Sequence, residues 1–110
     1  MRIDFLWYED CPSHPQARVL LREALQAVGV KAQIVEQKVE TQAQAEALRF
    51  PGSPTIRING EDIDPVGAAV ARSALTCRTY GWADGRLQPL PEKRRIIAAL
   101  RRASESGHGS

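Results

Sequence analysis

Cys11 is the residue of this sequence best placed to do covalent chemistry. It lies between a short apolar run and a long helical pattern, where free N–H groups and the positive end of the helix dipole favour a thiolate over a thiol. We expect His14 to face Cys11 across the first turn and to stabilise the thiolate as an imidazolium or as a hydrogen-bond donor. Glu9 and Asp10 oppose the thiolate because they carry like charge, but they can point to water. We therefore predict that Cys11 is a reactive nucleophile rather than an inert buried cysteine.

Cys77 is the second thiol of the chain and the only internal partner for Cys11. A thiol that attacks a disulfide needs a second thiol to release the mixed disulfide, and His14 stands where a C-x-x-C motif has that cysteine. Resolution by Cys77, resolution by an external thiol such as glutathione, and a packing role for Cys77 all remain open. The separation of the two cysteines decides between them, because Cα atoms more than about 7 Å apart cannot be bridged without backbone movement.

The segment Gly52-Ser53-Pro54-Thr55 is a second candidate for a functional turn. It immediately precedes a predicted strand, and proline is tolerated at the start of an edge-side strand because it need not donate an N–H group to the ladder. A proline at such a tight entry can also adopt the cis form.

Hydrophobic periodicity predicts the elements that position these residues. The apolar stripe over residues 17–28 indicates a helix, the spacing of Thr41 and Gln44 indicates a capping box that starts a helix of about ten residues, and Asn59-Gly60 indicates a hairpin turn. The other expected elements are strands over residues 3–8, 30–39, 55–58 and around Ile63, a short helix within 66–75, an edge strand over 75–80 turning at Asp84-Gly85, and a helix over 91–103. This order predicts an α/β fold with a mixed sheet of four to five strands and helices on both faces.

Length and composition restrict the functional classes. A chain of 110 residues suits one domain, which we place at residues 1–103, followed by a flexible polar tail over 104–110. The net charge of +2 is far from the basic excess of a nucleic-acid binder. Without a secretory signal or a run of about 18 to 20 apolar residues, we expect a cytoplasmic protein with no membrane or nucleic-acid partner and no cofactor. Two cysteines are too few for a disulfide framework, so any bond between them should be transient in a reducing compartment.

Three segments together give the chain a resemblance to a known family. The order of elements resembles the thioredoxin-like fold over roughly residues 1–103, and CPSH at 11–14, GSPTIRING at 52–60 and LTCRTY at 75–80 resemble a family of small bacterial thioredoxin-like proteins. Some members carry selenocysteine at the nucleophile position, and they are often labelled alkylmercury-lyase-like. The resemblance implies that Pro54 is cis and faces the cysteine motif, and that Ser53 offers its backbone to an extended substrate. Cys11, Pro12, Ser53, Pro54 and Thr55 would then share one site.

Three functions are compatible with these residues. The first, which we favour, is thiol redox chemistry on a protein or small-molecule disulfide, with Cys11 as nucleophile, His14 tuning it and Cys77 or an external thiol resolving. The second is binding of a soft metal ion or an organomercurial by Cys11 and Cys77. The third is a non-catalytic module whose Ser53-Pro54 turn captures an extended peptide.

Overall fold

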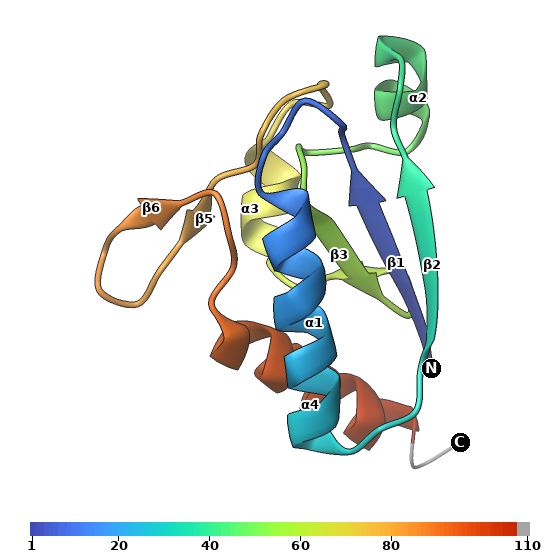
Figure 1. Cartoon of the computed structure of the whole chain (residues 1–110), viewed down its shortest axis with the longest axis vertical. Helices are drawn as coiled ribbons and strands as arrows, with labels where there is room; N and C mark the ends of the chain where they lie inside the picture. The colour runs from blue at the N-terminus through green and yellow to red at the C-terminus, as the bar shows by residue number, and fades with distance from the viewer. Residues whose placement is uncertain (108–110) are drawn as a thin grey trace.

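The computed structural model describes residues 1–107 of the chain and contains a small α/β fold (Figure 1). Its helices and strands follow in the order β1 (Arg2–Trp7), α1 (His14–Val28), β2 (Gln33–Lys38), α2 (Gln42–Ala47), β3 (Thr55–Ile58), β4 (Glu61–Asp62), α3 (Pro65–Val70), β5 (Tyr80–Gly81), β6 (Leu87–Gln88) and α4 (Lys93–Gly107). No helix among the described residues is both long enough and apolar enough to cross a membrane.

The main sheet has four strands in the order β2-β1-β3-β4. β1 runs parallel to β2 and antiparallel to β3, and β3 runs antiparallel to β4, which confirms the predicted mixed α/β sheet. Leu6 on β1 pairs with Thr55 on β3, so the end of β1 and the start of β3 lie at the same edge of the sheet. The segment after β1 and the segment before β3 therefore meet there. These are the segments that carry Cys11 and Ser53-Pro54.

Local sequence signals explain several of these elements. Helix α1 ends at Gly29, whose φ of 75° is easily reached by a residue without a Cβ. Thr41 and Gln44 form the predicted capping box at the start of α2. Asn59 and Gly60 have φ values of 51° and 87°, as a tight hairpin turn requires.

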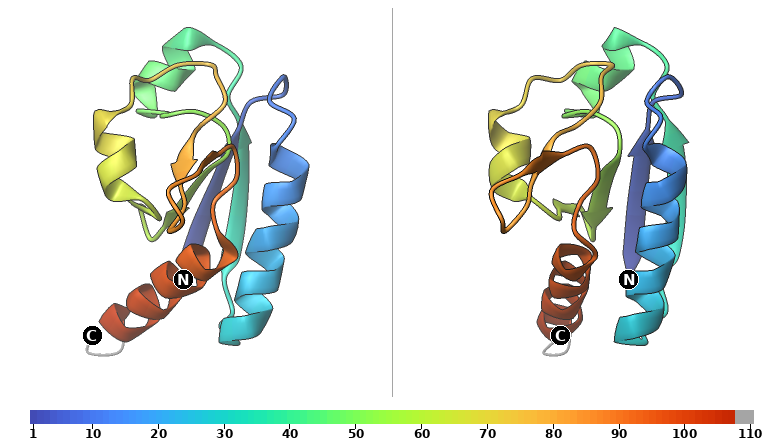
Figure 2. Two further views of the ribbon diagram at one scale, coloured as in Figure 1. Left: turned by 90° about the vertical axis from the view of Figure 1, so that its left-hand side faces the viewer. Right: turned by 60° about the vertical axis from the view of Figure 1, so that its left-hand side comes forward.

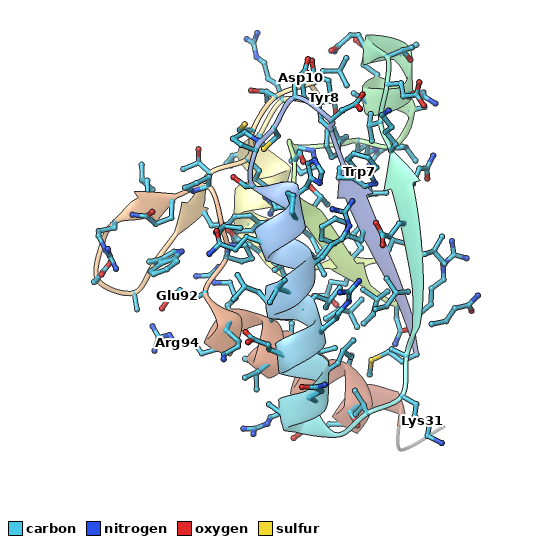
Figure 3. All side chains as sticks on the ribbon, viewed as in Figure 1. Trp7, Tyr8, Asp10, Lys31, Glu92 and Arg94 are labelled. Carbon is cyan, nitrogen blue, oxygen red and sulfur yellow. The ribbon has the colours of Figure 1, made fainter. Side chains whose placement is uncertain are left out.

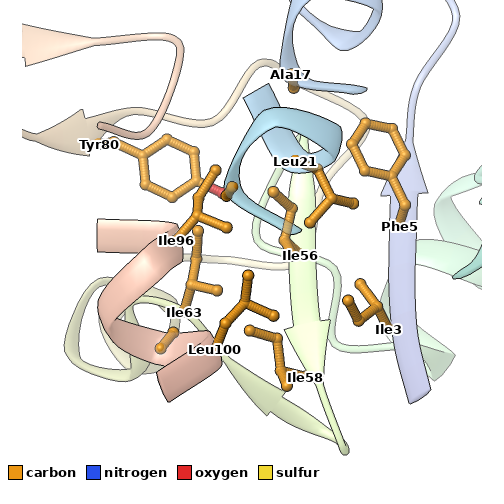
Figure 4. Packing of buried hydrophobic residues seen from close by; sticks show 12 residues of the cluster. Ile3, Phe5, Ala17, Leu21, Ile56, Ile58, Ile63, Tyr80, Ile96 and Leu100 are labelled. Carbon is orange, nitrogen blue, oxygen red and sulfur yellow. The ribbon is translucent and has the colours of Figure 1, made fainter. Parts of the chain in front are cut away.

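Helices α1 and α4 lie against one face of the sheet, and the short α2 lies beyond the ends of β1 and β2 (Figure 2). On one face, α1 and α4 bury the larger core (Figure 4). Its large aliphatic and aromatic members, from both sheet and helices, are Ile3, Phe5, Leu21, Ile56, Ile58, Ile63, Tyr80, Ile96 and Leu100. On the opposite face, Leu6, Val39, Ala45 and Phe50 form a second, smaller core beneath α2. Each fully buried aliphatic side chain contributes about 1.5–3 kcal/mol, so these cores hold the sheet edge that carries the cysteine segment.

Two helix lengths differ from the prediction. Helix α2 has six residues rather than about ten, because the chain turns at Arg49, whose φ is 51°, before it reaches Pro51. Helix α4 continues to Gly107 instead of ending at Ala103, since no proline or glycine interrupts it earlier. Residues 104–107 of the predicted tail are therefore helical, and residues 108–110 lie outside the described part of the chain.

The predicted edge strand over residues 75–80 is absent from the main sheet. Instead, Cys77 forms an isolated parallel bridge with Ser53, and Tyr80–Gly81 pairs with Leu87–Gln88 in a separate hairpin. The turn of that hairpin contains Gly85 at a φ of 88°, so the expected turn at this point is present but joins two very short strands.

Candidate functional site

Cys11 lies in a tight turn between β1 and α1. Its backbone N–H donates to the carbonyl of Tyr8 at 3.1 Å, and the helix itself begins after the N-cap residue Ser13. Cys11 therefore lies just before the helix, as expected, but two residues before the cap. Because the helix dipole acts mainly within the first turn, its effect on Cys11 is weaker than the sequence suggested.

The side chain of Cys11 is fully buried against the segment before β3. Its Sγ donates to the backbone carbonyl of Ser53 at 3.2 Å. The peptide bond between Ser53 and Pro54 is cis, as the family resemblance implied. Cys11 and the Ser53-Pro54 turn thus belong to one site.

Cys77 is brought to the same site by backbone hydrogen bonds to Ser53. The Ser53 N–H donates to the carbonyl of Thr76 at 2.8 Å, and the Arg78 N–H donates to the Ser53 carbonyl at 2.8 Å. These bonds form the parallel bridge between Ser53 and Cys77. The contact is close, since a Cβ placed on Gly52 would lie only 2.9 Å from the N and Cα atoms of Arg78. Residues 76–78 therefore lie against the Ser53-Pro54 turn like a short added strand.

The thiol of Cys77 lies near that of Cys11, since both residues contact Ser53. Cys77 is exposed whereas Cys11 is buried, and both are free cysteines. The hydrogen bond with Cys11, followed by partial burial and by the charge of Cys11, raises the pKa of Cys77 from 9.0 to about 11. The raised pKa thus lowers further the small fraction of Cys77 that is thiolate at neutral pH.

Replacing Cys11 with alanine should make Cys77 react about ten times faster with iodoacetamide near neutral pH. Loss of its neighbour returns the pKa of Cys77 toward 9.0, which raises the thiolate fraction by up to about 100-fold, and the lower nucleophilicity of the less basic thiolate offsets about tenfold of that gain. Mass spectrometry of the alkylated peptide measures the rate. Cys11→Ser serves as the companion variant, because serine keeps a hydrogen-bonding group but carries no charge. An unchanged rate in both variants would contradict the interaction between the two thiols.

His14 does not take the role that the sequence suggested. Its ring lies 4.5 Å from the ring of Trp7, its Nδ1 accepts from Nη1 of Arg18 at 2.7 Å, and the carbonyl of Glu9 accepts a further bond from the ring. Burial, followed by the charge of Arg18, lowers the pKa of His14, so the ring is neutral at neutral pH. Because guanidinium can only donate, Nδ1 is the acceptor and Nε2 carries the proton. None of these contacts involves Cys11, and a neutral ring is not the imidazolium that we expected beside the thiolate.

Tyr8 and Asp10 are neighbours of the site whose pairing sequence reasoning missed. The Tyr8 hydroxyl donates to Asp10 at 3.0 Å, at the turn that follows β1 (Figure 3). This bond and the charge of Asp10, with a smaller effect from the charge of Cys77, raise the pKa of Tyr8. Asp10 is exposed, as expected, and it also accepts this bond from Tyr8. The sequence analysis did not identify this pair.

Buried polar contacts anchor the segment that carries Cys77. Arg78 makes a bidentate ion pair with Asp62 on β4, with both N–O distances at 2.7 Å, and also donates to Thr55 at 3.3 Å. The Tyr80 hydroxyl donates to the carbonyl of Pro54 at 2.6 Å. Sequence analysis missed Arg78 and Asp62, since single charged residues in a mixed sequence are usually exposed.

The predicted substrate-binding residues differ in accessibility. Pro12 is exposed beside the site, whereas Ser53, Pro54 and Thr55 are all fully or almost fully buried. The Thr55 hydroxyl donates to the Gly52 carbonyl at 2.6 Å, so it serves the turn itself. The Ser53 hydroxyl is buried and has no hydrogen-bond partner among the described residues.

The described residues contain no group of three or more histidine, cysteine, aspartate or glutamate side chains that could hold a metal ion. Comparison of the chain with family models, with curated proteins and with solved structures finds no match.

Proposed function

We propose that this protein is a thiol–disulfide oxidoreductase of the thioredoxin-like class, with Cys11 and Cys77 as its redox pair. The observation that carries the proposal is that both free cysteines, one buried and one exposed, contact the same residue of the Ser53-Pro54 turn: the Cys11 thiol donates to the Ser53 carbonyl, and Cys77 forms a backbone bridge with Ser53. This arrangement brings the two thiols near each other, as a redox pair requires.

The assignment to the thioredoxin-like class rests on three features. The chain has a parallel βαβ unit followed by an antiparallel hairpin in the strand order β2-β1-β3-β4. The turn before β3 contains the cis bond at Pro54, and that turn contacts the cysteine that follows β1. The sequence motifs at 11–14, 52–60 and 75–80 resemble the same class and contribute to the same site.

The proposed reaction proceeds in two exchange steps. The Cys11 thiolate attacks one sulfur of a substrate disulfide, forms a mixed disulfide and releases the other substrate sulfur as a thiolate. The Cys77 thiol then loses its proton to solvent and attacks Sγ of Cys11, which forms the Cys11–Cys77 disulfide and releases the second substrate thiolate. The substrate gains two electrons and the protein loses two. An external dithiol, or two monothiols, returns the protein to its reduced form by the reverse exchange.

The shift in the pKa of Cys77 favours this order of steps. The hydrogen bond with Cys11, partial burial and the charge of Cys11 raise the pKa of Cys77. A Cys11 that is part of a mixed disulfide can no longer ionise, so the pKa of Cys77 falls and a larger fraction of Cys77 is thiolate. The second exchange is therefore easier once Cys11 has captured a substrate.

Mild oxidation provides the test of this function. With an excess of oxidised glutathione, the protein should lose the mass of two hydrogen atoms, and peptide mapping should find one bond between Cys11 and Cys77. Cys11→Ala and Cys77→Ala are the matched controls, because neither can form an intramolecular bond. A wild-type protein that keeps both thiols free under these conditions would contradict the proposal.

A soft metal ion is the alternative ligand for the same two thiols. Since the described residues offer no group of three ligands, Cys11 and Cys77 would have to hold the ion alone, which restricts the choice to thiophilic ions such as Hg(II) or Cu(I). Titration with such an ion distinguishes this function from redox exchange. Stoichiometric binding that is lost in either alanine variant, without any disulfide after oxidation, would favour the metal.

A further inference from the structure

Ser53 has no free backbone group with which to bind a second chain. Its N–H donates to Thr76 and its carbonyl accepts from Arg78, both at 2.8 Å, and the same carbonyl also accepts from Cys11. An extended peptide that added itself beside the Ser53-Pro54 turn would need these N–H and carbonyl groups. Residues 76–78 of the chain already use them.

From this arrangement we infer that residues 76–78 act as a built-in substitute for a peptide substrate, and that the protein acts on small-molecule disulfides rather than on disulfides in extended protein segments. The inference rests on the proposed function. It identifies Thr76, Cys77 and Arg78 as specificity-determining residues, because they occupy the backbone groups and present a cysteine to Cys11 as a bound substrate would.

The strength of the attachment supports this inference. The ion pair between Arg78 and Asp62 is almost completely buried, and the Tyr80 hydroxyl secures the following residues to Pro54. The close approach at Gly52 leaves no room between the two segments. A small disulfide reaches Cys11 by a movement of the Cys77 side chain, whereas a peptide must first break two backbone hydrogen bonds.

Charged side chains around the site do not offset the cost of displacing residues 76–78. Cations on the surrounding segments are already paired, since Arg78 contacts Asp62 at 2.7 Å, Arg18 contacts Glu36 at 2.6 Å and Lys38 contacts Glu9 at 2.9 Å. A longer substrate therefore gains no strong electrostatic contact that would repay displacement of residues 76–78.

Two probes with the same leaving group test the inference. One is the mixed disulfide of cysteamine with thionitrobenzoate, and the other is the mixed disulfide of thionitrobenzoate with a cysteine at the centre of a short extended peptide. Both release the same coloured thiolate, and the rates with free dithiothreitol correct for intrinsic reactivity. After this correction, the wild-type protein should react with the cysteamine probe at least about tenfold faster, as expected when two backbone hydrogen bonds must break.

Gly52→Ala tests whether residues 76–78 cause the difference. Its Cβ would collide with the Arg78 backbone, so the variant should loosen the segment and reduce the preference for the small probe by at least about threefold. Gly60→Ala is the matched control, because Gly60 also has a positive φ but has nothing within 4 Å of an added Cβ. The control should keep the wild-type preference, so an equal loss in both variants would overturn the role of the contact.

Measurements on the wild-type protein also test the inference if Gly52→Ala does not fold. The Arg78 amide should exchange slowly with deuterium, and exchange at the rate of an unstructured amide would overturn the inference. Equal corrected rates for the two probes would overturn it while leaving the redox function intact. Failure of the wild-type protein to react with either probe would instead overturn the redox function and the inference with it.

Discussion

Cys77→Ser is expected to stop the protein after its first chemical step, with the substrate held on Cys11 as a mixed disulfide. In the wild-type protein the resolving thiol and Cys11 both lie against Ser53, so the second step is intramolecular. In the variant, an external thiol must replace it in a bimolecular reaction. At external thiol concentrations well below the millimolar range, steady-state reduction of a small disulfide should fall about 100-fold or more.

Intact mass spectrometry after a single turnover measures this effect directly. The variant should carry one substrate half on Cys11 and release one thiol, whereas the wild-type protein should carry none and release two. The double variant Cys11→Ser/Cys77→Ser is the control, since it removes both thiols and should neither retain a substrate half nor release a thiol. Wild-type turnover in the Cys77→Ser variant at low external thiol would contradict the role of Cys77.

Asp62→Ala is expected to destabilise the fold by about 3–5 kcal/mol, a large share of the stability of a small domain. The side chains of Arg78 and Asp62 are only 3% and 7% exposed, and the guanidinium cannot lose its proton when its partner is removed. The variant therefore leaves an unpaired charge between β4 and the Cys77 segment. It also removes the acceptor for the backbone N–H of Asp64, which adds to the loss.

Urea denaturation of the reduced protein measures this change in the free energy of unfolding. The surface control is Glu23→Ala, because Glu23 and Lys93 are about half exposed, lie 3.7 Å apart and should contribute less than about 1 kcal/mol. The double variant Asp62→Leu/Arg78→Met replaces both charges with apolar groups and should recover much of the stability lost in Asp62→Ala. A loss no greater than that of the surface control would show that the buried ion pair does not anchor the segment.

Most of the main sheet and the helix that follows β1 could be predicted from the sequence, because they depend on local patterns. The apolar stripe of α1, the capping box at Thr41 and the turn at Asn59-Gly60 each occupy fewer than about 18 consecutive residues. The end of α2 was harder to predict because it depends on a single residue, Arg49, that adopts a left-handed conformation.

The site could be predicted only in part. Cys11 and the Ser53-Pro54 turn follow and precede strands that pair, so their meeting follows from the fold. The position of Cys77 depends on hydrogen bonds to Ser53 from a segment without regular secondary structure, and such pairings leave no periodic signal. His14 was misjudged because sequence spacing places it near Cys11 but does not show Trp7 and Arg18, which hold the ring elsewhere.

The anchoring of residues 76–78 links the reduction potential of the proposed pair to the stability of the fold. A bond between Cys11 and Cys77 closes a loop of about 66 residues, which on the chain-entropy model stabilises the folded state by about 4 kcal/mol. Free energy is a state function, so folding must make that bond harder to reduce by the same amount, about 90 mV for a two-electron couple. Urea should therefore move the potential of the pair to less negative values as the protein unfolds. A measurement of redox equilibrium in increasing urea would report the folding of the chain through the chemistry of its two sulfur atoms.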